Sequence, residues 1–290
     1  MAEQTVTIID TNAMDWISGP DLLASMDKDF VANLGPADEV ADAFDHYLVK
    51  PLLREPGGRR MDLAKFTPGY RDVTACYHRS SEEGFCIDGS FDLAFEGHFG
   101  PEHYFWRPPG WVHGTLKTEG ATALFSFEAE STVEQSGPVT RTVAEYTEAG
   151  TNPLLAEGDS ARIGPRGYVP NLAGAFVARQ PGGLWLRDPE TARALDADRL
   201  VVRVLSQNIY TGGGTFLWDL QPGYAQPEAV ALADTYHYFV VSGAVTIDGT
   251  EHPAGTWVYV PAGTVAGPLA SPKGATLYVK ADAAPKRSAV

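Results

Sequence analysis

The sequence predicts an all-β protein made of two similar β-barrels in tandem, with a few added helices. Short runs of β-branched and aromatic residues alternate with turn residues along most of the chain. Turn residues of the first half also recur in the second half at nearly constant spacing. The length of 290 residues allows two domains of ordinary size, each able to bury its own core.

The strand signals are runs rich in Val, Ile, Phe, Tyr, Trp and Thr. The 30 glycines and 21 prolines divide these runs into short segments. Clear examples are residues 89–95, 123–127, 238–241 and 256–260. Many short strands bounded by turn residues are typical of barrels and sandwiches.

Two segments have helical rather than strand spacing. A helix is expected over residues 38–53, where apolar residues recur at the spacing of one helix face. These residues are Val40, Phe44, Tyr47 and Leu48. Residues 21–33 have a weaker pattern of the same kind. We expect both helices to be additions to an all-β frame.

The internal repeat consists of turn residues that match at an offset of 154 or 153 positions. Such an offset over four landmarks indicates a duplicated β unit. The matching residues are Pro68, Gly69 and Tyr70 with Pro222, Gly223 and Tyr224; Gly89 with Gly243; Pro108 and Gly110 with Pro261 and Gly263; and Gly120, Ala121 and Thr122 with Gly274, Ala275 and Thr276. We therefore expect an N-terminal barrel over residues 1–150, a C-terminal barrel over residues 151–290, and a linker within residues 128–170.

Composition argues against several classes of protein. The formal net charge of -15 argues against a basic face for nucleic acid. No apolar run reaches the ~18–20 residues that cross a bilayer, and the polar N-terminus lacks the pattern of a secretory signal. The only cysteines, Cys76 and Cys86, form no disulfide framework, which favours a reducing, cytoplasmic setting. The expected partner is a small-molecule substrate, without nucleic acid or membrane.

Candidate metal ligands lie between the landmarks of the first half. His78 and Glu82 precede Gly89, with six residues between Glu82 and Gly89. Residues 108–113 then read P-P-G-W-V-H and end in His113. These segments resemble the two motifs of the cupin family. The first motif is H-x-H, three or four residues, E, six residues and G, and the second is P-x-G-x-x-H.

The resemblance implies a cupin barrel, the jelly-roll or double-stranded β-helix, in each half. In detail the sequence is most similar to ChrR-like and DUF4437-like cupins. The resemblance also implies one divalent metal ion per chain, held by His78, Glu82 and His113. Two imidazoles and one carboxylate suit Fe(II), with positions left open for oxygen and substrate, although zinc, manganese, nickel and cobalt could bind the same ligands.

The first histidine of the family motif is replaced here by Cys76. If Cys76 and His78 lie on one strand, both side chains point to the same face. Cys76 could then be a fourth metal ligand, a thiol beside the ligands, or a small apolar filler of the core.

The second half lacks these ligands. At the three ligand positions the landmark offsets place Leu232, Tyr236 and Ala266. None of them is a strong metal ligand, so a metal site is expected in the first barrel only. His237 follows the position of the carboxylate, and we expect it on the opposite strand face as a structural or surface residue.

Other residues are candidates for a substrate pocket or for proton transfer. Arg71 could bind a substrate carboxylate or phenolate, and aromatic residues beside the second motif could line the pocket of a ring-bearing substrate. These aromatic residues are Tyr104, Trp106 and Trp111. Candidate bases, by proximity in the sequence alone, are Glu83, His103 and Tyr77. Core packing and surface ion pairs would explain the same arginine and aromatic residues nearly as well.

Three functions are compatible with such a site. The first is a dioxygenase-type iron(II) oxygenase acting on a small chelating substrate, such as an aromatic, diketone or polyketide-like compound. The second is a cyclase, isomerase or lyase that uses the metal as a Lewis acid. The third is a non-catalytic ligand-binding protein. Fold likeness is a weak basis for choosing among them, and the oxygenase is our leading expectation. The chain could form a homodimer, or its two barrels could pack as a pseudo-dimer.

Overall fold

The structure is a computed structural model, and the chain forms two compact units. The N-terminal unit is Asp15–Arg166, and the C-terminal unit combines Met1–Met14 with Gly167–Val290. The expected boundary at residue 150 lies outside the described residues. The structure describes residues 5–55, 58–73, 76–78, 80–93, 96–107, 113, 115–128, 140–142, 168–170, 189–208 and 211–283.

The described strands of the N-terminal unit form open, antiparallel sheets rather than one closed ring. The main sheet has the order β2-β3-β4-β11-β6-β9, a smaller sheet has the order β10-β7-β8, and β12 pairs with β5. The strands are β2 (Ile17–Ser18), β3 (Tyr47–Arg54), β4 (Arg60–Phe66), β5 (Cys76–His78), β6 (Ser81–Gly89), β7 (Phe91–Leu93), β8 (Gly97–Phe99), β9 (Tyr104–Arg107), β10 (Leu116–Lys117), β11 (Ala121–Glu128) and β12 (Thr140–Thr142). Strand β12 lies within the segment expected to be a linker, and most of that segment is outside the described residues.

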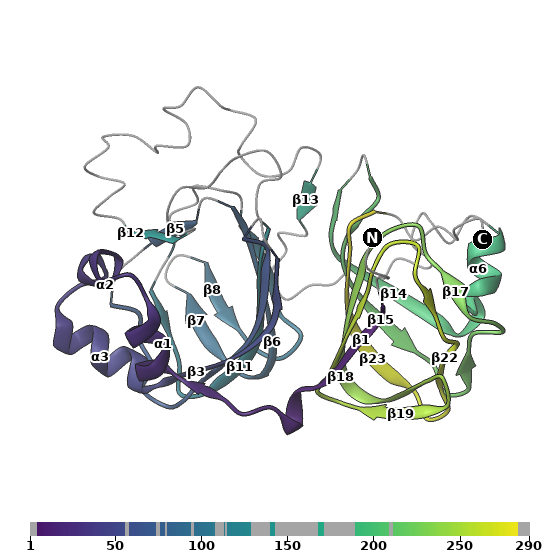
Figure 1. Ribbon diagram of the computed structural model, residues 1–290, viewed down its shortest axis with the longest axis horizontal. Helices are drawn as coiled ribbons and strands as arrows, with labels where there is room; N and C mark the ends of the chain where they lie inside the picture. Colours follow the sequence, from purple (N-terminus) through teal and green to yellow (C-terminus); the bar gives the residue numbers. More distant parts are fainter. Residues whose placement is uncertain are drawn as a thin grey trace. The chain divides into compact units, whose positions relative to one another are not determined.

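Three short helices precede β3, and Figure 1 shows them grouped at one end of the N-terminal unit. They are α1 (Gly19–Ser25), α2 (Lys28–Leu34) and α3 (Ala37–Asp45). Ser18 begins α1, because its hydroxyl accepts a hydrogen bond from the N–H of Asp21 at 3.2 Å. Pro20 in the first turn has a backbone angle that suits a helix start. Both α1 and α3 contact β3.

The helix expected over residues 38–53 is correct only in its first half. Helix α3 ends at Asp45, and the rest of the segment is strand β3. Pro51 explains part of the difference, because proline inside a helix removes a hydrogen bond and clashes with the preceding turn. Pairing of β3 along the length of β4 then stabilises the extended form. The weaker pattern over residues 21–33 corresponds to two helices, α1 and α2.

Four neighbouring strands of the N-terminal unit hold side chains in register. Residues directly opposite each other on antiparallel strands point to the same face. One row across β4, β11, β6 and β9 consists of Arg60, Phe127, Glu82 and Arg107. The neighbouring row on the same face consists of Asp62, Phe125, Gly84 and Phe105. Gly84 leaves room for the Phe105 ring, which would lie 2.2 Å from a Cβ atom at this position.

The C-terminal unit repeats this strand order. Its main sheet contains the path β14-β15-β23-β18-β20, whose members lie 153 or 154 residues after β3, β4, β11, β6 and β9. The internal repeat predicted from turn residues is therefore present in the sheets. The elements are β13 (Tyr168–Pro170), α6 (Pro189–Ala194), η4 (Ala197–Arg199), β14 (Leu200–Asn208), β15 (Gly214–Leu220), β16 (Tyr224–Ala225), β17 (Val230–Ala231), β18 (Tyr236–Ile247), β19 (Thr250–Pro253), β20 (Thr256–Val260), β21 (Val265–Ala266), β22 (Leu269–Ser271) and β23 (Ala275–Ala281).

The first strand of the chain, β1 (Thr7–Asp10), belongs to the C-terminal unit. It pairs antiparallel with β20, and the short helix η1 (Thr11–Ala13) follows it. The N-terminal unit therefore begins later than the barrel expected over residues 1–150, since a short edge strand carries no sequence signal for the sheet that it joins.

The prediction of a mostly β chain with few added helices is confirmed. None of the helices in the described ranges is long and apolar enough to span a membrane.

Candidate metal centre

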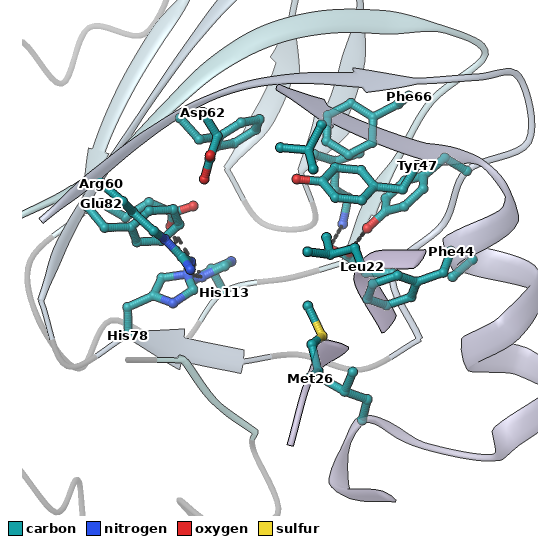
Figure 2. A pocket seen from close by; sticks show the side chains of 18 of the residues that line it. Leu22, Met26, Phe44, Tyr47, Arg60, Asp62, Phe66, His78, Glu82 and His113 are labelled. Carbon is teal, nitrogen blue, oxygen red and sulfur yellow. Dashed lines mark hydrogen bonds and ion pairs between the residues drawn. The ribbon is translucent and has the colours of Figure 1, made fainter. Parts of the chain in front are cut away.

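Three potential metal ligands converge on one point of the N-terminal unit. His78 is the last residue of β5, Glu82 lies near the start of β6, and His113 lies between β9 and β10. The Nε2 atoms of His78 and His113 are 3.0 Å apart, and each lies 3.3 Å from Oε2 of Glu82. All three side chains are buried. Figure 2 shows them together at one side of a pocket.

The three donor atoms fit a small divalent metal ion. Ligand atoms that each lie about 2.1 Å from one ion are about 3.0 Å apart at right angles and about 3.4 Å apart in a tetrahedron. The observed separations of 3.0 and 3.3 Å fall within this range. Imidazole nitrogen and carboxylate oxygen suit first-row divalent metals, including Fe(II). Within the described ranges no other group of three His, Cys, Asp or Glu side chains brings its donor atoms together in this way.

Arg107 orients the Glu82 carboxylate and keeps it charged. Its Nη1 donates to Oε2 of Glu82 at 2.6 Å, while Nε and Nη2 donate to the two oxygens of Glu96 at 3.0 and 2.5 Å. Burial by itself raises the pKa of Glu82, but Arg107 and the two histidines outweigh burial and hold this pKa well below its usual range. Glu82 is therefore ionised at neutral pH, as a metal ligand must be.

His113 is suited to ligation by its neutral ring. Burial lowers the pKa of His113 to about 3, even though the nearby Glu82 carboxylate acts in the opposite direction. The neutral imidazole keeps a lone pair that a metal ion can bind. The ring of His78 is held differently, by an edge-on contact with Phe127 at 4.7 Å between ring centroids.

A cavity of about 460 Å³ lies beside these three residues. Its volume is in the range of small-molecule sites, ~300–1,000 Å³. Figure 2 shows Arg60 on the same side as the three candidate ligands, whereas Leu22 of α1, Met26 directly after α1 and Phe44 of α3 lie across the pocket. The cavity therefore has a polar end at the candidate ligands and an apolar end beneath the helices.

Aromatic rings form much of the wall of the cavity. The ring of Phe66 lies 4.6 Å from Tyr70, 5.3 Å from Tyr47 and 6.0 Å from Phe125, between centroids. Phe125 in turn lies 6.1 Å from Phe105. All five rings line the cavity. Aromatic pairs at these separations attract one another, so the wall is a connected and well-packed surface.

Three candidates on β6 and β9, which are Glu83, Tyr104 and Trp106, do not line this cavity. Glu82 and Arg107 face the cavity, so their chain neighbours Glu83 and Trp106 point to the opposite face of the strands. Tyr104 shares the face of Trp106, because it lies two residues before it. The alternation along each strand, rather than proximity in the sequence, decides which residues reach the site.

Two other candidates also lie away from the cavity. His103 is half-buried and does not line it, and the exposed Arg71 lines a separate hollow with residues of β7 and β8. Cys76 shares strand β5 with His78, as expected. The side chains of Cys76 and Tyr77, and the whole of Trp111, lie outside the described residues. Their predicted roles therefore remain predictions.

Asp72 lines the cavity although it was not predicted from the sequence. One of its oxygens accepts a hydrogen bond from the Tyr70 hydroxyl at 2.6 Å, and the other accepts one from the N–H of Leu116 at 2.7 Å. Burial raises the pKa of Asp72 above its usual range, in spite of these hydrogen bonds. No motif marks this residue, because its position depends on the pairing of distant segments.

Arg60 and Asp62 are two further cavity residues that were not predicted. Asp62 forms a salt bridge with Arg54, and burial raises the pKa of Asp62. The internal repeat contains a signal that could have found them. An offset of 154 places Gly214 and Phe216 at the positions of Arg60 and Asp62, so the second half loses these charges together with the metal ligands.

The described part of the C-terminal unit contains no comparable site. Leu232 and Tyr236, which occupy two of the ligand positions, belong to its apolar core, and Ala266 packs against that core. Large buried rings, including Trp218 and Tyr238, occupy the interior. That metal ligands are confined to the first half remains a prediction.

His237 lies on the strand face opposite to Tyr236, as alternation requires. It is buried rather than exposed, and its ring packs against Trp257 at 5.9 Å and Tyr259 at 5.1 Å between centroids. These contacts support its interpretation as a structural residue.

Comparison with solved structures finds similar chains at low sequence identity. A candidate dioxygenase from Nostoc punctiforme has a TM-score of 0.67 and 14% identity, over 99% of this chain and 87% of its own. The E. coli protein Ylba has a TM-score of 0.52 and 10% identity, over 96% and 90%. A variant of oxalate decarboxylase from Bacillus subtilis has a TM-score of 0.52 and 14% identity, over 100% and 81%. No family model matches this chain, and no curated protein matches its sequence.

Likeness at these identities establishes the fold. The chain has the jelly-roll fold of cupins, as the motifs predicted. The same likeness does not establish a reaction, because one fold supports many chemistries. The function must therefore be inferred from the residues of the site.

Proposed function

We propose that the N-terminal unit binds one divalent metal ion through His78, Glu82 and His113 and acts as an iron(II) oxygenase on a small chelating substrate. The observation that carries this proposal is the convergence of two imidazole nitrogens and one carboxylate oxygen within 3.3 Å of one another. These atoms lie at the polar end of a cavity of about 460 Å³. Two imidazoles and a carboxylate are the donor set typical of iron(II) oxygenases.

The structural neighbours support an enzyme of this general kind. One of them is a candidate dioxygenase and another is oxalate decarboxylase. Since their likeness shows the fold alone, the choice of an oxygenase rests on the donor set. The finer similarity to ChrR-like and DUF4437-like cupins stays a prediction.

The residues of the cavity have separate roles in this proposal. Bound iron(II) would supply the activation of oxygen and of a chelated substrate. Arg107 holds the Glu82 carboxylate in place through the hydrogen bond of 2.6 Å. Leu22, Met26 and Phe44 enclose the apolar part of the substrate and exclude water. The aromatic wall orients a ring-bearing substrate by stacking.

A second candidate function uses the metal only as a Lewis acid, in a cyclisation, isomerisation or elimination. This reaction needs a base within the cavity. Asp72 is the observation that favours it, because its half-buried carboxylate lines the cavity and desolvation raises its pKa. Asp72 would remove a proton from the bound substrate.

Oxygen uptake separates the two candidates. The protein is loaded anaerobically with Fe(II), and oxygen consumption is followed with a panel of catechols, 1,3-diketones and hydroxy-ketones. We expect uptake that requires both a panel compound and Fe(II), and that is lost when zinc replaces iron. Conversion of a compound by the zinc-loaded protein without oxygen, abolished in Asp72→Asn, would instead support the second candidate. Binding without any conversion would contradict both and support a ligand-binding protein.

A further inference from the structure

Arg60 belongs to the same row of side chains as the candidate ligand Glu82. In the pairing of β4, β11 and β6, Phe127 lies directly opposite Arg60 on one side and Glu82 on the other. Side chains at directly opposed positions share a face. Arg60 therefore faces the cavity at the level of the metal centre, as its place in the cavity lining and in Figure 2 also indicates.

One aromatic ring separates the Arg60 guanidinium from the metal centre. The central carbon of the guanidinium lies 4.1 Å from the centroid of Phe127. The same ring contacts His78 at 4.7 Å between centroids. A guanidinium over an aromatic face is held by the charge distribution of the ring and keeps its N–H groups available at its edge.

Arg60 has no ion pair among the described residues. Its Nε is buried and makes no hydrogen bond with any group that the structure describes. The nearest carboxylate along β4 belongs to Asp62, which is paired with Arg54. Arg60 as a whole is half-buried, and its charge lowers the pKa of Asp62 less than the charge of Arg54 does. A partly buried cation without a direct ion pair favours an anionic group beside it, and the polar end of the cavity offers the space for one.

The fold does not require an arginine at this position. In the C-terminal unit, the equivalent row consists of Gly214, Ala281, Tyr236 and Val260, which pair across β15, β23, β18 and β20 in the same order. This unit forms the same sheet without any charge in the row. The charge of Arg60 is therefore present only where the candidate ligands are present, which assigns it to the site rather than to the sheet.

We propose that Arg60 binds a carboxylate group of the substrate, which makes the substrate a small organic acid with an apolar body. The proposal rests on the proposed function of the same cavity. The two Nη groups of the guanidinium form a planar pair of donors that matches the two oxygens of a carboxylate. The chelating part of the molecule lies at His78, Glu82 and His113, and its apolar part lies toward the helices. Arg60 is thus a specificity-determining residue for acids over neutral analogues.

Calorimetric titration with matched acids and amides tests this assignment. The probes are small aryl and alkyl carboxylic acids, each paired with its own primary amide, titrated into zinc-loaded and metal-free full-length protein. The wild type is expected to bind at least one acid about 10-fold or more tightly than its amide in both forms, because a charged hydrogen-bond pair is stronger than a neutral one. Arg60→Gln is expected to lose this preference, and Arg60→Lys to retain part of it. Metal content and unfolding midpoint show that each variant is folded.

Arg71→Gln is the matched control, because Arg71 lies outside the cavity; it should keep the preference for acids. The proposal is overturned if Arg60→Gln discriminates acids from amides as the wild type does, or if the wild type binds no acid more tightly than its amide. Failure of the proposed metal-dependent function would give a different result in the same titrations. The protein would bind no zinc, while the preference for acids and its dependence on Arg60 would remain in the metal-free form.

Discussion

Replacing His113 with alanine is expected to abolish metal binding by the N-terminal unit and, with it, any metal-dependent turnover. His113 supplies one of only three converging donor atoms among the described residues, and its neutral, buried ring is suited to ligation. Loss of a residue that merely supports a ligand already costs about 10- to 100-fold in metal affinity. Loss of a ligand should exceed this range. Anaerobic loading with Fe(II), followed by desalting and metal analysis, measures the effect.

A second histidine of the same unit provides the control. His98 is exposed on β8 and lies 2.9 Å from a carboxylate oxygen of Asp92, away from the cavity. His98→Ala should retain the metal content of the wild type. If His113→Ala also retains it with unchanged affinity, the three-residue centre is wrong.

Replacing Arg107 with alanine is expected to destabilise the metal-free N-terminal unit by about 3–5 kcal/mol. Arg107 is only 3% exposed and donates to two carboxylates, those of Glu82 and Glu96. Its removal leaves Glu82 buried without its strongest charge partner, and an uncompensated buried charge accounts for most of the loss. Urea unfolding of the metal-free protein gives the free energy of unfolding.

An exposed arginine tests whether this effect depends on burial. Arg193 lies 3.7 Å from Glu228, and both side chains are largely in solvent. Surface ion pairs of this kind contribute about 0–1 kcal/mol, so Arg193→Ala should be nearly neutral. A loss below about 1 kcal/mol for Arg107→Ala would show that Arg107 does not compensate the buried carboxylates.

The sequence allowed the three candidate ligands to be predicted, because the motif spacing and the internal repeat point to the same positions. The repeat also predicted the duplicated strand order of the two units. Both signals depend on turn residues, whose backbone requirements are local. Residues such as Gly89 and Gly243 have positive φ angles of 72° and 74° in equivalent turns.

The cavity could not be predicted in the same way, because its wall is assembled from segments that are distant in the sequence. Leu22 and Phe44 come from the helices α1 and α3, whereas Phe105 and Phe125 come from the strands β9 and β11. The position of Trp106 outside the cavity lining has a related cause. Proximity to a motif does not show which strand face a residue occupies, and that face is fixed only once the register is known.

Arg60 could be predicted from the sequence only in part, unlike the three candidate ligands and unlike the cavity wall. No motif includes it, and its contact with Phe127 depends on the pairing of β4 with β11. The internal repeat nevertheless places Gly214 at its equivalent position. Comparison of the two halves at every charged position would therefore have selected Arg60 before the structure was known.

The central claim is that the chain holds one metal ion, in the N-terminal unit. Its most direct test is the metal content of the full-length protein after anaerobic loading with Fe(II) and desalting. We predict one iron per chain, because the described residues bring together one group of three ligands and the C-terminal unit has Leu232, Tyr236 and Ala266 at the equivalent positions. Two irons per chain, or none, would contradict this account.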